Sequence, residues 1–338
     1  MLSLAFSAAM LGIEGYVVRV EADSSAGAPA FAIIGLPDRA LREAGDRVRS
    51  AIFNSGLAFP AGRLLVNLSP ADVRKAGPAF DLAIALALIG IDEQVDRDAL
   101  QTYVALGELA LDGSLQTVNG ILPMVLGARA AGFRKLIVPD ANADEALMVD
   151  GIEIYAVARL LDAVAVLGGN GSKWRCTRSP SSSASIEVAR DGDFFDVRGQ
   201  LAAKRALEIA AAGGHNVLLV GPPGCGKTML ARRLPSILPP MTNAQALDVT
   251  KIYSVAGLLR DTGIVRTRPF RYPHHTISQT ALVGGGGLAK PGEISLAHHG
   301  VLFLDELPEF GRSAIEVMRQ PLEEGVVTIA RAAGTFAY

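Results

Sequence analysis

One stretch of eight residues, 221–228, constrains the fold of this chain more than any other feature. It reads GPPGCGKT and fits the pattern G-x-x-x-x-G-K-[ST] at every position. A loop that wraps a triphosphate has to aim successive backbone N–H groups inward, and glycines reach the required backbone angles without a clash at Cβ. The neighbouring residues predict a strand at 216–220 before the loop and a helix from 227 to about 234 after it.

Each position of this loop has an expected role. Lys227 is long enough to reach the β- and γ-phosphates, and the Thr228 hydroxyl is a ligand for magnesium. Cys225 either serves as a redox-sensitive thiol at a helix N-terminus or only satisfies the need for a small residue, and we favour the second account. The residues predicted to bind the cofactor are Gly221, Pro222, Pro223, Gly224, Cys225, Gly226, Lys227 and Thr228.

An apolar run that ends in two carboxylates follows further along the chain. Residues 300–304 predict a fully buried strand, and Asp305 and Glu306 stand at its carboxyl end, where parallel sheets place ligands. We expect Asp305 to hold magnesium through water together with Thr228, and Glu306 to orient or activate the attacking water. The loop and the acidic pair predict a P-loop NTPase with ATP and Mg²⁺ as cofactors.

Composition divides the chain into two domains. Residues 170–193 are rich in Ser, Gly and charge and poor in large apolar side chains, which is typical of a linker. We therefore predict a first domain at 1–169, a linker at 170–193 and a second domain at 194–338. The second domain should open with a helix at 200–212 that ends at Gly213 and Gly214.

The first domain mixes patterns of strands and helices. Strands are predicted at 15–21, 63–68, 103–111, 135–138 and 153–156, and helices at 38–54 and 81–88. Asp38 is placed to cap the first of these helices. The mixture predicts a small two-layer α/β sandwich.

Charge and cysteine content exclude several classes of protein. The net charge is −2, so no overall basic field indicates a nucleic-acid partner, although a local basic patch is compatible with it. Cys176 and Cys225 cannot build a disulfide framework, which points to a reducing, cytoplasmic compartment. The apolar start lacks a basic region and is interrupted by Glu14, so we do not interpret it as a signal peptide, and no run is long enough to span a membrane. Four of the five histidines stand in two adjacent pairs, at 274–275 and 298–299. Each pair is a poor zinc chelator by itself, because adjacent side chains of a strand point to opposite faces.

A chain of motifs over 199–338 resembles the magnesium-chelatase-like branch of AAA+ ATPases, and within it the YifB/ComM family. Besides the P-loop, the resemblance rests on segments 199–200, 203–208, 269–271, 273–275, 284–287, 291–300, 307–310 and 319–323. The resemblance implies a homo-hexameric, ATP-driven and helicase-like motor that promotes branch migration of recombining DNA, single-stranded or branched, during competence. It also implies that 278–296 and a hairpin at 325–335 project into the pore of the ring.

Residues 1–168 are similar to the N-terminal domain of the same family, which looks like the catalytic domain of Lon protease. The similarity rests on segments 34–38, 47–52, 66–72, 75–82, 107–109, 119–122 and 130–132. Lon-like proteases need a serine nucleophile and a lysine base, but the matching positions here are Ala79 and Leu122. We therefore expect a catalytically dead module that serves binding or assembly.

The match stops at Tyr338, before the positions at which the family has its sensor 1 strand, arginine finger and helical lid. The expected fold is thus a Lon-protease-like α/β domain followed by a P-loop NTPase (AAA+) α/β domain that lacks its last strand and lid. We expect this chain to bind ATP with reduced or no turnover. Two other functions stay open, a magnesium-chelatase-type subunit and a non-catalytic ATP-binding remnant.

Overall fold

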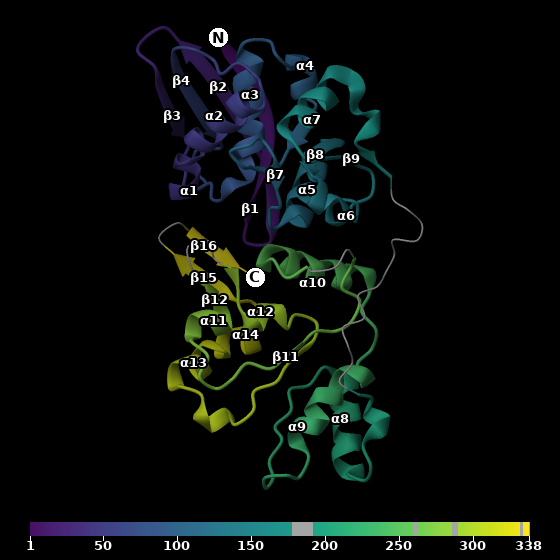
Figure 1. Ribbon diagram of the computed structural model, residues 1–338. Coiled ribbons are helices and arrows are strands. Elements are labelled where there is room, and N and C mark those ends of the chain that lie inside the picture. The colour runs from purple at the N-terminus through teal and green to yellow at the C-terminus, as the bar shows by residue number, and fades with distance from the viewer. Residues whose placement is uncertain (178–191, 260–262, 286–289, 332–333, 338) are drawn as a thin grey trace. The chain divides into compact units, whose positions relative to one another are not determined.

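The computed structural model of the chain describes residues 1–177, 192–259, 263–285, 290–331 and 334–337 (Figure 1). The chain divides into two compact units, Met1–Ser182 and Ser183–Tyr338. Each unit is mixed α/β, in agreement with the fold class expected from the sequence.

The first unit is built on a mixed sheet of eight strands. Their order is β10 (Arg175–Cys176), β9 (Glu153–Val157), β8 (Lys135–Pro139), β5 (Tyr103–Ala105), β1 (Leu2–Leu11), β2 (Glu14–Ser25), β4 (Arg63–Ser69) and β3 (Ala30–Ile34). Strands β9, β8, β5 and β1 run parallel, β3 runs parallel to β4, and the other neighbours are antiparallel. A separate pair, β6 (Glu108–Leu109) and β7 (Leu115–Gln116), is antiparallel.

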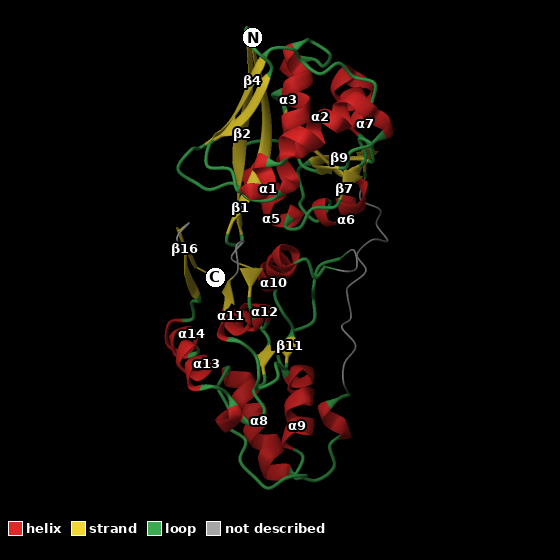
Figure 2. Cartoon of the chain, turned by 60° about the vertical axis from the view of Figure 1, so that its left-hand side comes forward, coloured by secondary structure: helices red, strands yellow, loops and turns green. Residues whose placement is uncertain are grey.

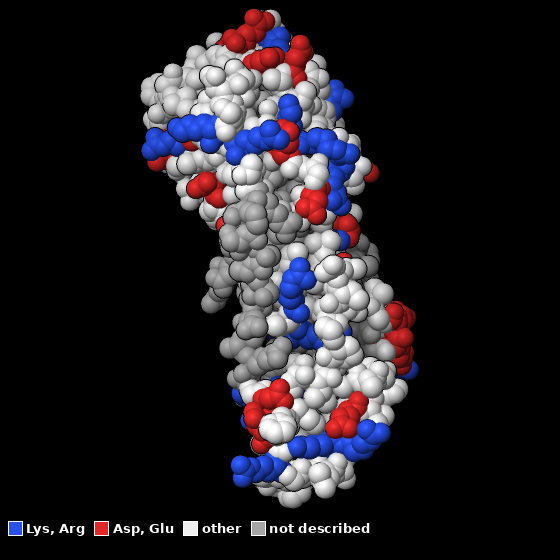
Figure 3. Space-filling model, turned by 90° about the vertical axis from the view of Figure 1, so that its right-hand side faces the viewer, with Lys and Arg blue, Asp and Glu red and all other residues white. Residues whose placement is uncertain are grey.

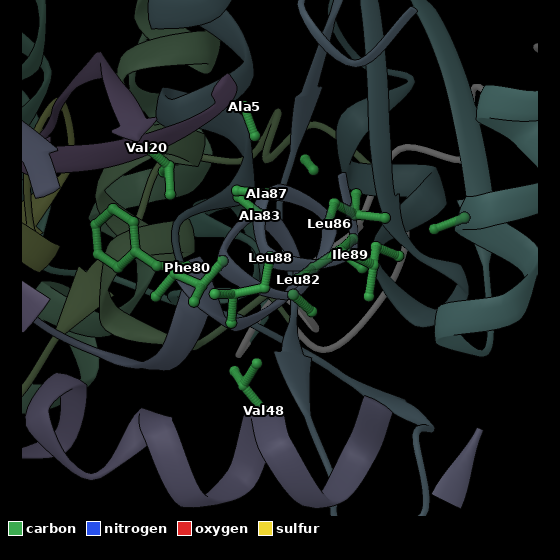
Figure 4. Packing of buried hydrophobic residues seen from close by; sticks show 14 of the residues in the cluster. Ala5, Val20, Val48, Phe80, Leu82, Ala83, Leu86, Ala87, Leu88 and Ile89 are labelled. Atoms are coloured by element: carbon green, nitrogen blue, oxygen red, sulfur yellow. The ribbon is translucent and has the colours of Figure 1, made fainter. Parts of the chain in front are cut away.

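Helix α3 (Asp81–Ile91) forms the centre of the core, because all eleven of its residues are buried. It packs beside α2 (Ala44–Asn54) and against β1 and β2 (Figures 2 and 4). Burial of each large aliphatic side chain contributes about 1.5–3 kcal/mol, so this one helix accounts for much of the hydrophobic stabilisation of the unit. The short helices α4 (Arg97–Leu100) and α7 (Leu160–Ala165) contribute Leu100, Leu160 and Ala163 to the same cluster.

Asp81, the first residue of α3, is a carboxylate inside this core. Its side chain is fully buried and receives two hydrogen bonds from Arg47, at 2.9 and 3.1 Å, and one from the Leu109 backbone N–H. Burial raises the pKa of the Asp81 carboxyl to about 6, against the opposing effect of Arg47. The ion pair thus connects α2 to the start of α3 and places a desolvated carboxylate in the core.

Helices also cover the second face of the sheet, which the sequence did not indicate. Ala5 of β1 faces the α3 cluster, whereas the neighbouring Phe6 contacts the ring of Phe133, with 4.9 Å between ring centroids. Because successive strand residues point to opposite faces, Phe133 and the preceding α5 (Ile121–Ala130) lie on the other side. Helix α6 (Ala143–Ala146) packs against α5, and the expected two layers become three.

The predicted elements of the first unit are largely confirmed. Asp38 caps α1 (Arg39–Arg42) by accepting a 2.8 Å hydrogen bond from the Leu41 N–H, although the predicted helix is interrupted at Glu43 before α2. The strand predicted at 103–111 is interrupted at Gly107, where φ is +157°. Residues 170–177 were predicted as linker, but β10 pairs with β9 and belongs to the sheet. Residues 178–191 of the predicted linker lie outside the described residues.

The second unit begins with α8 (Leu201–Gly213), α9 (Lys227–Arg233) and α10 (Asn243–Ala256). Strand β11 (Phe270–Arg271) pairs in parallel with β14 (Val301–Leu302). Between them lie α11 (Gln279–Val283), the antiparallel pair β12 (Gly284–Gly285) and β13 (Lys290–Pro291), and α12 (Glu293–Leu296). The unit continues with α13 (Arg312–Val317), α14 (Arg319–Glu324), β15 (Thr328–Arg331) and β16 (Gly334–Ala337).

Two predictions for this unit are wrong in detail. Residues 216–220 form no strand, because they pair with no other segment of the described chain, and Leu218 and Val220 are 76% and 85% exposed. The predicted strand at 300–304 is formed only at 301–302 and is half-buried, since it has a partner strand on one side alone among the described residues.

The antiparallel hairpin of β15 and β16 confirms the hairpin expected near 325–335. Residues 286 and 287, the second half of the segment 284–287 on which the family resemblance rests, lie outside the described residues.

Candidate nucleotide site

The loop at 221–228 leads directly into α9. Gly224 and Gly226 have φ of +76° and +91°, a region in which a side chain would be strained. A Cβ atom on Gly221 would come within 2.9 Å of the Cys225 sulfur. Positions 224 and 226 therefore favour glycine for their backbone conformation, whereas Gly221 packs closely against the Cys225 side chain. Residues 221–224 are exposed, which leaves their backbone accessible to a ligand.

Lys227 folds back over this loop. Its ammonium group donates hydrogen bonds to the backbone carbonyls of Gly221, at 2.8 Å, and Pro222, at 3.0 Å. It also lies 3.8 Å from the Cys225 sulfur. The side chain is thus held against the loop rather than extended into solvent. Its ammonium group could also donate hydrogen bonds to phosphate oxygens.

The structure brings Thr228 and Asp305 together, although 77 positions separate them in the sequence. The Thr228 hydroxyl donates a 3.0 Å hydrogen bond to Oδ2 of Asp305. Strand pairing explains the placement: Phe303 N–H donates to the Arg271 carbonyl, so β14 is held beside β11 almost as far as the carboxylate. The other oxygen, Oδ1, accepts a 3.1 Å bond from the Glu306 N–H.

Glu306 occupies a different position from Asp305. Its backbone is left-handed, with φ of +53°, and its side chain is 67% exposed. Oε2 lies 3.5 Å from Nδ1 of His275. The two adjacent carboxylates therefore lie in different environments. Asp305 contacts Thr228, whereas Glu306 lies exposed at the rim of the site.

Tyr272, which the sequence did not single out, also reaches Asp305. Its hydroxyl donates a 3.1 Å hydrogen bond to Oδ2, and its ring packs on Phe303 with 5.2 Å between centroids. Desolvation, together with the hydrogen bond to Asp305, raises the pKa of Tyr272, so the hydroxyl remains a donor at neutral pH. Tyr272 follows the last residue of β11, and only the pairing of β11 with β14 could have revealed its position.

Gln200 is a second contact that the sequence did not reveal. Its side-chain amide donates a 3.1 Å hydrogen bond to the Cys225 carbonyl, and its backbone is left-handed with φ of +54°. It therefore connects the start of α8 to the phosphate-binding loop.

The histidine pairs do not lie on strands. The rings of His274 and His275 contact each other in a tilted arrangement with 4.1 Å between centroids, and those of His298 and His299 do so with 3.9 Å, so the expectation of opposite faces is wrong. Burial lowers the pKa of His298 and of His299. Over the described ranges, no group of three or more His, Cys, Asp or Glu side chains could hold a metal ion.

The oxygens that meet at Thr228 and Asp305 suit a hard divalent cation. Mg²⁺ prefers oxygen ligands and is commonly held by one or two protein groups together with phosphate oxygens and water. A hydroxyl and a carboxylate in contact, next to a loop suited to phosphates, meet that requirement. The residues present therefore fit Mg·ATP.

Charged side chains are unevenly distributed over the surface. Figure 3 shows Lys and Arg gathered in a band across one face of the first unit, with Asp and Glu on either side of it. A smaller basic group lies on the second unit in the same view. In the part of the chain that the structure describes, no helix is long and apolar enough to cross a bilayer.

Two segments of the chain match families of known proteins, and these matches define the class of protein. Residues 193–338 match the family described as magnesium chelatase, subunit ChlI, and residues 20–142 match the family described as subunit ChlI of Mg-chelatase. The class is thus that of magnesium-chelatase-like AAA+ ATPases.

Individual relatives narrow the class further. Competence protein ComM of Haemophilus influenzae is 45% identical over 332 residues, 98% of this chain and 65% of the relative. YifB of Escherichia coli is 44% identical over 337 residues, 100% of this chain and 66% of the relative. An uncharacterized protein of Mycobacterium tuberculosis is 45% identical over 340 residues, 100% of this chain and 67% of the relative. The chain belongs to the ComM/YifB family and spans about two thirds of the length of these relatives.

Two partial matches concern other families. Lon protease 2 of Bacillus subtilis is 30% identical over 89 residues, 26% of this chain and 16% of the relative. DNA repair protein RadA of the same organism is 30% identical over 131 residues, 37% of this chain and 28% of the relative. Both matches are with α/β proteins and agree with the fold class.

Proposed function

We propose that the second unit binds ATP with Mg²⁺ through residues 221–228, Asp305 and Glu306. The observation that carries this proposal is the 3.0 Å hydrogen bond from the Thr228 hydroxyl to Asp305, which joins the phosphate-binding loop to the acidic pair. Each half of the site is a common pattern, but together they form the arrangement by which P-loop NTPases hold Mg²⁺ beside the phosphates.

The residues divide the work of binding. Lys227 exchanges its bonds to the Gly221 and Pro222 carbonyls for phosphate oxygens, which compensate for the loss because they carry charge. Thr228 and Asp305 hold the cation, and the cation neutralises charge on the phosphates when bound. Glu306, exposed at the rim, accepts a hydrogen bond from the attacking water and orients it.

We further propose that the nucleotide drives motion on DNA, as a ComM-like branch-migration motor of a homo-hexamer in the cytoplasm. The support is the match to a competence protein over 98% of this chain. The basic band in Figure 3 offers a surface for phosphates in a chain whose net charge is −2. The first unit serves as a binding or assembly module, since Ala79 and Leu122 provide neither a nucleophile nor a base.

A magnesium-chelatase-type subunit is the second candidate, and the descriptions of both matching families favour it. The feature against it is the Lon-like unit that precedes the nucleotide site. A chain that binds ATP without turning it over is the third candidate.

One set of assays separates these functions. ATP hydrolysis is measured with forked DNA, with protoporphyrin and Mg²⁺, and with neither, and nucleotide binding is measured in parallel. Stimulation by forked DNA supports the motor, and stimulation by protoporphyrin supports the chelatase subunit. Binding without turnover under all conditions supports the non-catalytic chain, and failure to bind Mg·ATP contradicts the whole proposal.

A further inference from the structure

The carboxylate of Asp305 is fixed by more than its contact with Thr228. Oδ2 accepts hydrogen bonds from the Thr228 hydroxyl at 3.0 Å and from the Tyr272 hydroxyl at 3.1 Å, while Oδ1 accepts one from the Glu306 N–H at 3.1 Å. Thr228 and Asp305 are the residues that hold the cation in the proposed function, whereas Tyr272 has no role there. Its hydroxyl donates to the carboxylate that does the binding.

The ring of Tyr272 is held independently of this hydrogen bond. It packs on Phe303, which lies two residues before Asp305, and the Arg232 guanidinium lies over its face at 5.5 Å from the centroid. Phe303 in turn stacks on Phe270 of β11, with 6.1 Å between centroids. The hydroxyl is therefore presented by a ring that is 43% exposed and that contacts Phe303 and Arg232.

Helix α9 contacts both partners of this arrangement. Thr228 and Arg232 are four positions apart on the helix and therefore share one face. Thr228 binds Asp305 and Arg232 covers Tyr272. Helix α9 is therefore joined at two points to the residues that follow β11 and β14. Thr228 contacts Asp305 and Arg232 contacts Tyr272, while Tyr272 and Asp305 contact each other.

We propose that Tyr272 is a positioning residue for divalent-cation binding, acting through the orientation of Asp305. A free carboxylate rotates about its side-chain bonds, and a cation that it binds has to offset the loss of that freedom. The Tyr272 hydroxyl restricts the rotation of the Asp305 carboxylate before the cation binds. It therefore strengthens nucleotide binding only when the cation is present. This inference rests on the proposed Mg·ATP site and adds to it a residue outside both motifs.

The test compares nucleotide affinity with and without the cation. Binding of a fluorescent ATP analogue to the whole chain is titrated over a range of Mg²⁺ concentrations and, separately, in excess EDTA. The variants are Tyr272→Phe, which keeps the ring, and Tyr253→Phe as a matched control. Tyr253→Phe removes a hydroxyl hydrogen bond in the second unit, to the Leu296 carbonyl at 3.2 Å, and the interaction of that hydroxyl with the Arg271 side chain. Among the described residues, it leaves in place the hydrogen bonds that the Asp305 carboxylate accepts.

For Tyr272→Phe we expect the Mg²⁺ concentration at half-maximal binding to rise about three- to tenfold, the effect of one hydrogen bond to a charged group. Affinity in EDTA should stay within about twofold of the wild type, because the hydroxyl acts only through the cation. Tyr253→Phe should match the wild type in both conditions.

The outcomes distinguish this inference from the proposal beneath it. If the wild type binds nucleotide with Mg²⁺ and Tyr272→Phe has the same Mg²⁺ dependence, the positioning role is wrong and the site stands. If Tyr272→Phe weakens binding equally in EDTA, the residue supports the site only by packing, and the inference is again wrong. If the wild type shows no Mg²⁺-dependent binding, the proposed function itself fails.

Discussion

Thr228, the second residue of α9, and Asp305, three residues beyond β14, are joined by a 3.0 Å hydrogen bond across 77 positions of sequence. The contact depends on the pairing of β14 with β11, because that pairing fixes where the chain turns toward the helix. Predictions about the nucleotide site therefore concern both the side chains that meet there and the backbone that brings them together.

Removal of the Lys227 ammonium should weaken ATP binding strongly. Hydrogen bonds to charged groups are worth about 1.5–3 kcal/mol, so Lys227→Ala should lose about tenfold to hundredfold in affinity. Equilibrium titration with a fluorescent nucleotide measures the change. Lys173→Ala, which removes an exposed lysine of the first unit, serves as the control. Equal affinities for the two variants would show that Lys227 does not contact the phosphates.

The two neighbouring carboxylates should respond differently to neutralisation. Asp305→Asn should weaken nucleotide binding about tenfold in Mg²⁺ and little in EDTA, because it removes charge at the cation. Glu306→Gln should leave binding within about twofold, since Glu306 is exposed at the rim and is assigned to water. Calorimetric titration of both variants tests the assignment, which would be reversed if Glu306→Gln were the one that lost Mg²⁺-dependent binding.

The close approach of β14 and β11 predicts a backbone-sensitive position. A Cβ atom on Gly300 would lie 2.1 Å from the Pro269 carbonyl oxygen, which accepts the Val301 N–H at 2.8 Å. Gly300→Ala should separate the strands, displace Asp305 and reduce Mg²⁺-dependent nucleotide binding by at least about tenfold.

Gly311→Ala is the matched control, because nothing lies within 4 Å of a Cβ atom at that position and its φ is ordinary. Mg²⁺-dependent nucleotide titration of the two glycine variants provides the comparison. A Gly300→Ala protein that binds as well as Gly311→Ala would show that the strand pairing does not position Asp305.

The buried Asp81 predicts a pH dependence of stability in the first unit. Its pKa is raised from 3.8 to about 6, so the folded state binds a proton at this carboxyl more tightly than the unfolded state does. The stability that this shift provides is fully present below pH 3.8 and is lost as the pH rises through about 6. One pKa unit corresponds to about 1.4 kcal/mol, so the loss should reach about 2–3 kcal/mol.

The comparison of wild type with Asp81→Asn isolates this effect from other carboxylates. Trp174, the single tryptophan, packs against the core of the first unit and reports its unfolding by fluorescence. Between about pH 4 and pH 7, the free energy of unfolding of the wild type should fall relative to the variant. A constant difference between the two proteins would mean that the pKa of Asp81 is not raised.

The sequence predicted the first unit well wherever one segment carried its own signal. Asp38 indicated a helix start, and the apolar run at 81–88 indicated a buried helix, because caps and burial patterns are local. The strand at 2–11 was not predicted, since an apolar stretch at a chain start lacks the alternation of a half-buried strand. Its place beside β5 and β2 is decided by non-local pairing.

For the nucleotide site, the sequence supplied the residue types and the structure supplied their neighbours. The loop at 221–228 and the pair Asp305 and Glu306 followed from patterns. Tyr272 could not be predicted, because its contact with Asp305 spans 33 positions and depends on the strand register. The segment 216–220 shows the opposite error: a strong strand pattern stays unpaired where no partner strand lies beside it.

The most direct test of Mg·ATP binding is a double-mutant cycle on Thr228 and Asp305. Thr228→Val, Asp305→Asn and the double variant are titrated with ATP in Mg²⁺ by calorimetry. If both residues hold one cation, the double variant should bind no worse than the weaker single variant, with a coupling of at least about 1 kcal/mol. Effects that simply add, or a wild type whose ATP affinity does not depend on Mg²⁺, would contradict the site.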